Sequence, residues 1–366
     1  MAKRKPRLDG HLIALCRRGV MNKVLLAALV LTLSINALAS AAPKLRAYNV
    51  DLGQSSVSGL SSGGFMAVQF HVAFSSIVVG AGVVAGGPYY CTQGSWFALW
   101  FYLNQCTIVS FWVPSPNAVR LLRHAHEFAA RQEIDDLANL THDKVYIFSG
   151  TNDYSVRQSV VSQTNAFYQL AGVPVENIQY VNSLNAGHAV ITDDYGNSCA
   201  RTGSPFINDC DYDQAGAILR HIYGDLNPPA TSSNGGKIIE FSQAEFINNP
   251  RFHSMSNVGY IYVPKSCAQG DICKVHIAFH GCGQTMEKIG DRFYRRAGYN
   301  EWAATNNIIV LYPQLVELAW HNPEGCWDWW GYDNADYYNK KGPQMAAVMA
   351  MLKRLAAKDK IGLEQQ

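Results

Sequence analysis

The amino-acid sequence predicts an α/β fold in which a mostly parallel sheet is covered by helices on both faces. Segments typical of strands and of helices alternate along the chain, as parallel sheets require. Residues 77–84 form a continuous apolar run, which is typical of a strand buried on both faces. The chain of 366 residues is 48% hydrophobic and 16% charged, a composition that favours a compact soluble protein. Its length allows one large core or two smaller ones.

The elements follow in order along the chain. Before residue 225 we expect an extended segment at 47–50, helices at 65–74, 115–131 and 155–170, and strands at 77–84, 144–148 and 177–181. Ser115 and Pro116 suit the cap and first turn of the second helix. The stretch 225–236, rich in Pro, Gly, Ser and Asn, is predicted to be a linker. Beyond it we expect strands at 238–241, 259–263, 275–279 and 307–312, and helices at 287–305 and 345–357. Since neither side of the linker has an obvious closed sheet, we expect residues 42–366 to form one domain.

The N-terminus has the form of an export signal. Basic residues up to Lys23 precede an apolar run at 24–33, and small residues follow it before Pro43. We therefore expect a signal peptide over 1–41, with Met21 as an alternative start, and a secreted product, extracellular or periplasmic. The apolar run is too short for a stable membrane span, although a retained N-terminal anchor is the competing interpretation. The net charge is +2 and no basic stripe occurs beyond the signal, so nucleic acid is not an expected partner.

Eight cysteines lie beyond the signal, and an even number in an exported chain indicates disulfides. They allow 105 pairings, which the sequence leaves open. Three pairs would each close one loop, and the fourth follows by exclusion; the pairs are Cys91–Cys106, Cys199–Cys210, Cys267–Cys273 and Cys282–Cys326. No Cys or His spacing supports a zinc site, and we expect neither a metal nor an organic cofactor.

A single G-x-S-x-G motif, Gly59-Leu-Ser61-Ser-Gly63, follows an extended segment and precedes a helix-like run. This pattern is typical of the nucleophile elbow of α/β-hydrolases, in which small residues let a sharp strand-to-helix turn expose a serine hydroxyl. The alternative is a glycine-rich turn with two ordinary serines. We predict that Ser61 is the nucleophile and that the N–H of Ser62 donates to the oxyanion.

A serine nucleophile needs a histidine base and a carboxylate that orients it, and in this fold the chain order is Ser, acid, His. Asp153 follows the strand at 144–148, and His188 follows the strand at 177–181. Both residues therefore belong at the carboxyl edge of the sheet, where active sites of open α/β sheets lie. Asp193 and Asp194 are the competing acids, but they come after His188.

A second oxyanion donor normally comes from a His-Gly loop that precedes the serine in the chain. Here the loop His280-Gly-Cys-Gly-Gln284 lies far downstream, after the strand at 275–279. A circular permutation accounts for this order, with the strands between 238 and 312 that usually open the fold coming last. The final helix should then lead back toward the mature N-terminus. An unrelated glycine-rich turn is the alternative.

The densest aromatic stretch is 324–332, which contains Trp327, Trp329 and Trp330. Buried tryptophans commonly build cores. The functional interpretation is an apolar cleft wall that holds a polymer chain beside Ser61, to which Trp96, Trp100 and Trp112 could add.

Five segments together, GLSSGGFMAVQF, FSGTNDYSV, NAGHAV, AFHGCGQ and GCWDWWGY, resemble the extracellular polyhydroxybutyrate depolymerases, in particular those with a circularly permuted catalytic domain. The resemblance covers residues 45–355. It implies Ser61 as nucleophile, Asp153 as acid, His188 as base, and the amides of Ser62 and Cys282 as oxyanion donors. It also implies substrate contacts from the 327–330 stretch. Many bacterial members carry a C-terminal substrate-binding domain, which we do not expect in 42–366.

The resemblance implies a serine esterase that hydrolyses poly(3-hydroxybutyrate) or its oligomers, works without a cofactor and is a monomer. One alternative is a feruloyl or acetylxylan-type esterase on the same scaffold. Another is a non-catalytic protein that binds a polymer surface.

Overall fold

The computed structural model describes residues 42–94, 99–109, 113–231 and 235–357. The predicted signal peptide at 1–41, together with Trp96 and Trp112, lies outside these residues, and the side chain of Trp100 is not described.

An eight-stranded sheet forms the centre of residues 42–357. Across the sheet the strands are β4 (Ile178–Val181), β3 (Lys144–Phe148), β2 (Val78–Val84), β1 (Val50–Leu60), β10 (Cys273–Phe279), β11 (Ile308–Tyr312), β9 (Val258–Pro264) and β8 (Gly236–Ser242). The first six run parallel, and β9 is antiparallel to both of its neighbours. Strands from both sides of the predicted linker therefore share one sheet, and β1 pairs directly with β10.

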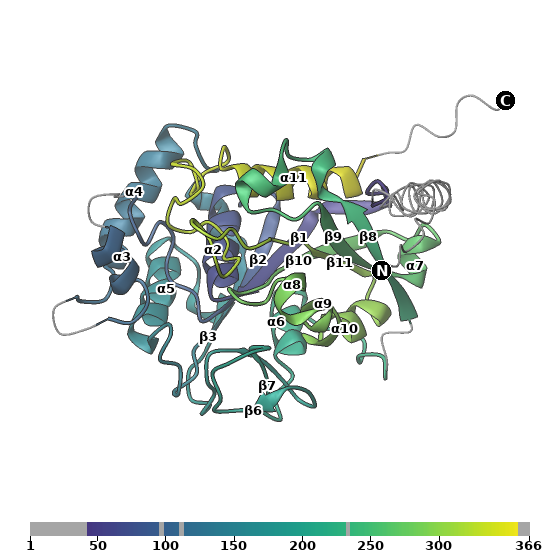
Figure 1. The fold of residues 1–366 in the computed structure, drawn as a ribbon, viewed down its shortest axis with the longest axis horizontal. Helices are drawn as coiled ribbons and strands as arrows, with labels where there is room; N and C mark the ends of the chain where they lie inside the picture. The colour runs from purple at the N-terminus through teal and green to yellow at the C-terminus, as the bar shows by residue number, and fades with distance from the viewer. Residues whose placement is uncertain (1–41, 95–98, 110–112, 232–234, 358–366) are drawn as a thin grey trace, which may run out of the picture. The chain divides into compact units, whose positions relative to one another are not determined.

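The strand order confirms the predicted permutation. The four strands after the linker fill one half of the sheet, and the four before it fill the other, as the separate purple-to-teal and green regions of Figure 1 show. The last helix, α11 (Pro343–Leu355), returns to the start of the described chain: the Tyr48 N–H donates to the carbonyl of Leu355 at 2.7 Å. The two ends of the described chain thus meet, as the permuted α/β-hydrolase fold predicts.

Helices cover both faces of the sheet. On one face, α6 (Gln214–Tyr223) packs Ile218 on Gly82 of β2, and α10 (Tyr299–Thr305) bonds the Tyr299 hydroxyl to Ser58 of β1 at 2.6 Å. On the other face, α2 (Ser62–Ala73) brings Phe70 to within 6.0 Å of the Phe279 ring. Alternate residues of β1 and β10 therefore pack on opposite layers, as expected of strands buried on both sides.

The remaining described elements are short or peripheral. They are α3 (Leu99–Gln105), α4 (Ala118–Ala130), α5 (Gln158–Leu170), α7 (Lys265–Ala268), α8 (Met286–Ile289) and α9 (Arg292–Arg296), the 3₁₀ turns Leu137–His142, Val175–Asn177, Gln243–Glu245 and Pro250–His253, and a small sheet of β5 (Val190–Thr192), β7 (Ile207–Asp209) and β6 (Asn197–Ser198). Within the described ranges no helix is long and apolar enough to cross a membrane.

Four predicted helix starts are wrong by two or three residues: the helices expected at 65 and 345 begin earlier, at Ser62 and Pro343, and the two expected at 115 and 155 begin later. The helix expected at 115 is capped by Asn117, whose side chain accepts the Arg120 N–H at 2.9 Å. The helix expected at 155 begins at Gln158, because the carboxylate of Asp153 takes the N–H groups of Ser155 and Val156 and holds them in a turn.

The single helix predicted over 287–305 is also wrong, because the structure has three short helices there. Gly290 and Gly298 adopt φ angles of 63° and 87°, a left-handed conformation that ends a helix. The helical periodicity of the segment is real, but two glycines divide it.

Candidate active site

Ser61 occupies a strained turn between β1 and α2. Its φ and ψ are 55° and −120°, a conformation that non-glycine residues seldom adopt and that costs on the order of 1–3 kcal/mol. The Ser61 N–H donates to the Val84 carbonyl at 2.9 Å, and the Ser61 carbonyl accepts from Phe65 at 2.9 Å. The turn is thereby fixed between the end of β2 and the first turn of α2, as in a nucleophile elbow.

The two glycines of the motif are required by space. A Cβ on Gly59 would lie 2.3 Å from the carbonyl oxygen of Gly63, so a side chain would prevent the turn from closing. A Cβ on Gly63 would lie 2.4 Å from the carbonyl oxygen of Phe279 and 2.5 Å from that of His280. The elbow therefore packs backbone to backbone against the loop that follows β10.

Asp153 and His188 form a buried hydrogen-bond contact. The Asp153 Oδ2 lies 2.7 Å from Nδ1 of His188, and the two residues are 3% and 7% exposed. The other carboxylate oxygen accepts the N–H groups of Ser155 and Val156 at 2.8 and 3.0 Å. Both oxygens are thus engaged, which fixes the carboxylate and points one oxygen at the imidazole. In the described chain the Ser61 hydroxyl makes no hydrogen bond to a side chain, as is common for catalytic contacts without substrate.

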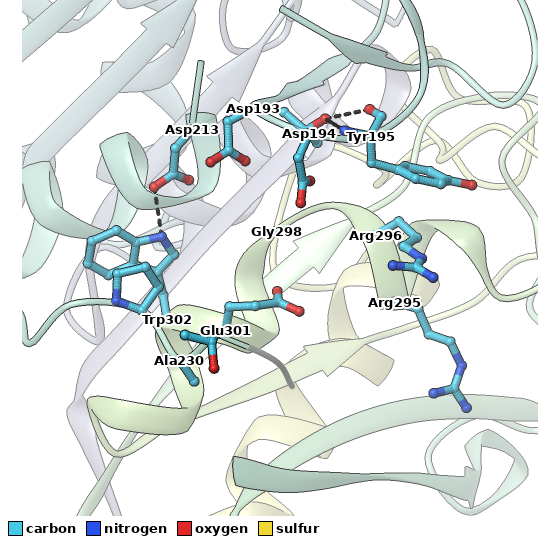
Figure 2. Close-up of a pocket in the computed structure, with 13 residues that line it drawn as sticks. Asp193, Asp194, Tyr195, Asp213, Ala230, Arg295, Arg296, Gly298, Glu301 and Trp302 are labelled. Atoms are coloured by element: carbon cyan, nitrogen blue, oxygen red, sulfur yellow. Dashed lines mark hydrogen bonds between the residues drawn. The ribbon is translucent and has the colours of Figure 1, made fainter. Parts of the chain in front are cut away.

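The competing acids lie elsewhere. Figure 2 shows Asp193 and Asp194 beside a hollow of about 340 Å³ that Asp213 and Glu301 also line. Both competitors are exposed, and neither is the partner of His188. Burial raises the pKa of Asp213 and of Glu301. Among the described residues no group of His, Cys, Asp and Glu is arranged to hold a metal ion.

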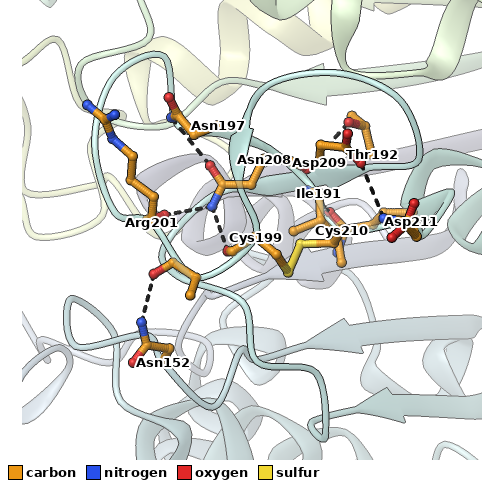
Figure 3. Close-up of a disulfide and its surroundings, with 12 residues drawn as sticks. Asn152, Ile191, Thr192, Asn197, Cys199, Arg201, Asn208, Asp209, Cys210 and Asp211 are labelled. Atoms are coloured by element: carbon orange, nitrogen blue, oxygen red, sulfur yellow. Dashed lines mark hydrogen bonds between the residues drawn. A yellow bond between two sulfur atoms is a disulfide. The ribbon is translucent and has the colours of Figure 1, made fainter.

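A disulfide-linked segment supports the candidate acid and the candidate base. Cys199 and Cys210 form a disulfide (Figure 3), and the Cys199 carbonyl accepts the N–H of Gly187 at 2.8 Å. The His188 N–H donates to the Thr202 hydroxyl at 2.9 Å, and the Asn152 side chain donates to the carbonyl of Ala200 at 2.7 Å. The backbone beside Asp153 and the backbone at His188 are therefore both hydrogen-bonded to the loop at 199–202.

Inside that segment, buried Asn208 donates to the carbonyls of Cys199 and Arg201 at 2.9 and 2.6 Å. Sequence reasoning missed the supporting roles of Asn152, Thr202 and Asn208. The only available signal was the position of Asn152 beside the candidate acid and the close spacing of two cysteines.

In the His280–Gln284 loop, the Cys282 N–H lies between N–H groups that are already hydrogen-bonded. The N–H groups of Gly281, Gly283 and Gln284 donate to Gln284 Oε1, the Glu324 carbonyl and the Gly281 carbonyl at 2.7, 2.7 and 3.3 Å. Within the described residues, the Cys282 N–H donates to no protein acceptor. The Ser62 N–H belongs to the first turn of α2, where N–H groups lack helical partners.

His280 holds this loop as a neutral side chain. Burial lowers its pKa to about 4, so the ring is uncharged near neutral pH. Its Nδ1–H donates to the Gly281 carbonyl at 2.8 Å, and its Nε2 accepts the Leu315 N–H at 3.3 Å. The two ring nitrogens thus take opposite roles, which fixes one tautomer.

The four disulfides join the pairs that the sequence favoured. The Cys282–Cys326 bond connects the His280–Gln284 loop to the aromatic stretch 324–332. Movement of either segment therefore affects the other.

The three tryptophans of that stretch have different environments. Trp327 is fully buried, with its ring 4.9 Å from that of Phe279. Trp329 stacks on Phe65 of α2 at 4.1 Å, and Trp330 contacts Trp329 at 5.2 Å while remaining partly exposed. The core interpretation therefore applies to Trp327, and Trp330 is the best placed of the three to meet a ligand.

Asp328 organises this loop and was not predicted. Its buried carboxylate accepts the N–H groups of five successive residues, 330–334, at 2.7–3.3 Å. Burial raises the pKa of Asp328 to about 7, although the N–H donors of Gly331, Asn334 and Asp333 oppose that shift. The loop conformation that presents Trp330 therefore depends on one carboxylate.

Comparison with known proteins is consistent with this arrangement. No family model matches the chain. Over 321 residues the chain is 45% identical to a poly(3-hydroxybutyrate) depolymerase from Delftia acidovorans, which covers 87% of this chain but 62% of that protein. It is 38% identical over 333 residues to a polyhydroxybutyrate depolymerase from Talaromyces funiculosus, covering 87% of this chain and 94% of that protein.

Two solved structures share the fold. The crystal structure of a PHB depolymerase from Penicillium funiculosum superposes with a TM-score of 0.78 at 37% identity, covering 86% of this chain and 98% of the other. A PHB depolymerase complexed with an R3HB trimer gives the same TM-score at 36% identity.

The permuted sheet and the relatives together define a carboxylic ester hydrolase with the α/β-hydrolase fold. The chain belongs to the polyhydroxybutyrate depolymerase family.

Proposed function

We propose that this chain is a secreted serine esterase that hydrolyses poly(3-hydroxybutyrate) or its oligomers through Ser61, His188 and Asp153. The observation that carries the proposal is the buried 2.7 Å contact between Asp153 and His188, together with the strained turn at Ser61 on the same edge of the sheet. A relative with an R3HB trimer bound supports an oligomer of hydroxy acids as ligand.

The proposed reaction has two halves. In the first, His188 takes the proton of Ser61 as its hydroxyl oxygen attacks an ester carbonyl, and the N–H groups of Ser62 and Cys282 hold the oxyanion. His188 then protonates the leaving alkoxide, which departs as the hydroxyl end of one product. In the second, His188 deprotonates a water that attacks the acyl-Ser61 ester, releasing a carboxylic acid and restoring Ser61. Asp153 keeps the imidazole oriented and stabilises its charged form.

Residues 1–41 are proposed to be the signal peptide and 42–366 a single, monomeric catalytic domain. The four disulfides support an oxidising destination, because such bonds persist outside the cytosol. Trp330 is proposed to contact the polymer chain, with Trp329 behind it.

The test compares Ser61→Ala with Ser162→Ala, a serine on the surface of α5. Release of hydroxybutyrate from polymer film and from the soluble trimer is measured, beside hydrolysis of a feruloyl ester. We expect Ser61→Ala to lose about 10⁴-fold or more in kcat and to resist a fluorophosphonate label, and Ser162→Ala to retain both properties. Undiminished release by Ser61→Ala, or a feruloyl ester turned over faster than the trimer, would overturn the proposal.

A further inference from the structure

The side-chain amide of Gln284 joins two backbone segments that lie far apart in the sequence. The residue is 1% exposed. Its Oε1 accepts the N–H of Gly281 at 2.7 Å, and its Nε2 donates to the carbonyls of Pro205 and Phe206 at 2.9 and 3.1 Å. Every hydrogen-bonding group of this amide is therefore used in a backbone contact.

The two segments carry different parts of the candidate site. Gly281 precedes Cys282, whose N–H is unpaired among the described residues. The Phe206 carbonyl also accepts the N–H of Val190 at 3.0 Å, two residues after His188. One amide thus connects the loop that supplies an oxyanion donor to the strand that follows the base.

We infer that Gln284 is a positioning residue that fixes the Cys282 N–H and the His188 imidazole relative to each other, so that both can act on the same acyl group. The inference rests on the function proposed above and deepens it. The bond to Gln284 occupies the Gly281 N–H and that to Glu324 occupies the Gly283 N–H, so both neighbours of Cys282 are held while the Cys282 N–H stays available to an oxyanion.

Glutamine is the side chain that this position needs. It must accept one N–H and donate two N–H groups to carbonyl oxygens, which an amide does and a carboxylate cannot. A protonated glutamate could accept the Gly281 N–H and donate to one carbonyl, whereas an ionised glutamate would place a negative charge beside two carbonyl oxygens. Gln284→Glu is therefore expected to work only while its carboxyl is protonated.

Asn306 provides a matched control. It accepts the Asn227 N–H at 2.7 Å and donates to the carbonyls of Asn227 and Trp302 at 3.0 and 2.9 Å. It is 8% exposed and precedes β11, so it lies at the opposite end of the parallel strands from the candidate site. The two amides make the same kinds of bond, but only Gln284 joins segments of the site.

The experiment measures kcat and KM on the soluble (R)-3-hydroxybutyrate trimer for Gln284→Ala, Asn306→Ala and the wild type, each corrected for the folded fraction. We expect Gln284→Ala to lose about 10- to 10²-fold in kcat with KM changed less than about threefold, because a misplaced oxyanion donor weakens transition-state binding. Asn306→Ala should keep kcat within about twofold of the wild type, even if its Tm falls as far as that of Gln284→Ala. Equal kcat losses in the two variants, or none in Gln284→Ala, would overturn the inference.

A pH series gives a second readout that does not depend on the alanine variant folding. The ratio of Gln284→Glu to wild-type kcat should fall steadily between about pH 5 and about pH 8, as a buried carboxyl with a raised pKa ionises. The ratio for Asn306→Asp should stay flat; a flat ratio for Gln284→Glu also overturns the inference. Ser61→Ala is measured in parallel. If Ser61→Ala is inactive while the Gln284 variants behave as the wild type, only the positioning role of Gln284 fails. If Ser61→Ala is active, the proposed function fails as well.

Discussion

Replacing Asp153 by asparagine should disable the base without removing any atom that the fold needs. In the structure Asp153 Oδ1 accepts two backbone N–H groups, from Ser155 and Val156, and Oδ2 faces Nδ1 of His188. Asparagine has one oxygen, and the two N–H donors will hold it on their side. Its NH₂ group then points at His188 Nδ1 and can only donate to it.

The consequence is a change of tautomer. With Nδ1 as acceptor, the imidazole proton moves to Nε2, which can no longer take the proton of Ser61. Loss of this orientation in a serine triad costs about 10⁴-fold in kcat, which corresponds to about 5.5 kcal/mol of barrier. Stability should change little, because the turn at 153–156 keeps its two hydrogen bonds.

The assay is kcat on the soluble trimer together with a thermal melt, for Asp153→Asn beside Asp193→Asn. Asp193 is exposed and was the competing acid, so its variant should behave as the wild type. The reasoning is refuted if Asp153→Asn retains more than about a tenth of the activity, or if Asp193→Asn causes the larger loss.

Three further perturbations follow from the contacts. Gly63→Ala should lower the free energy of unfolding by about 1–3 kcal/mol and remove most of the activity, because its Cβ would meet the carbonyl oxygens of Phe279 and His280. Gly53→Ala, whose Cβ would have a nearest contact at 3.4 Å, should change neither property. Both variants are measured by urea titration and by the trimer assay. Replacing both Cys199 and Cys210 by serine should lower the free energy of unfolding by about 2–4 kcal/mol and also lower kcat. The control replaces Cys267 and Cys273 by serine, which should lower the free energy of unfolding and leave kcat unchanged. Burial lowers the pKa of His276 to about 3, so at acid pH the unfolded chain binds a proton that the folded chain does not. The contribution of His276 to stability is complete above about pH 6.5 and falls by about 1.4 kcal/mol per pH unit as the pH drops from there toward about 3. In a series of urea titrations, His276→Gln should reduce the slope by about 1.4 kcal/mol per pH unit, whereas buried His280 keeps its own contribution; an unchanged slope would refute the assignment.

The sequence allowed good prediction of the features that local patterns encode. The strand at 144–148 was predicted at its observed bounds because the four buried residues after Lys144 form an apolar run, as a strand covered on both faces requires. The elbow was predictable because Gly59 and Gly63 are required by backbone contacts, which leave a fixed signature in the motif.

Other features depend on partners that are distant in the chain. The strands at 190–192, 197–198 and 207–209 are two or three residues long, too short for a period of two to be recognised, and a disulfide and Asn208 hold them together. Gln284 bonds to Pro205 across 79 residues, so no local window contains both groups. The loop around Asp328 was interpreted through its tryptophans, whereas the buried carboxylate between them sets the backbone.

The permutation leaves the candidate site unaffected because the site depends on which strands are neighbours, not on their order in the chain. Ser61, Asp153 and His188 follow β1, β3 and β4, and the proposed oxyanion loop, His280–Gln284, follows β10, which pairs with β1. The two halves of the chain therefore meet where the reacting acyl group would lie, and the backbone contact of Gly63 with the carbonyls after β10 crosses that junction. Gln284 crosses it a second time, from the oxyanion loop to the strand beyond His188. If the base is His188 and an oxyanion donor is the Cys282 N–H, as proposed, such cross-links are needed, since neither half alone can fix the distance between these two groups.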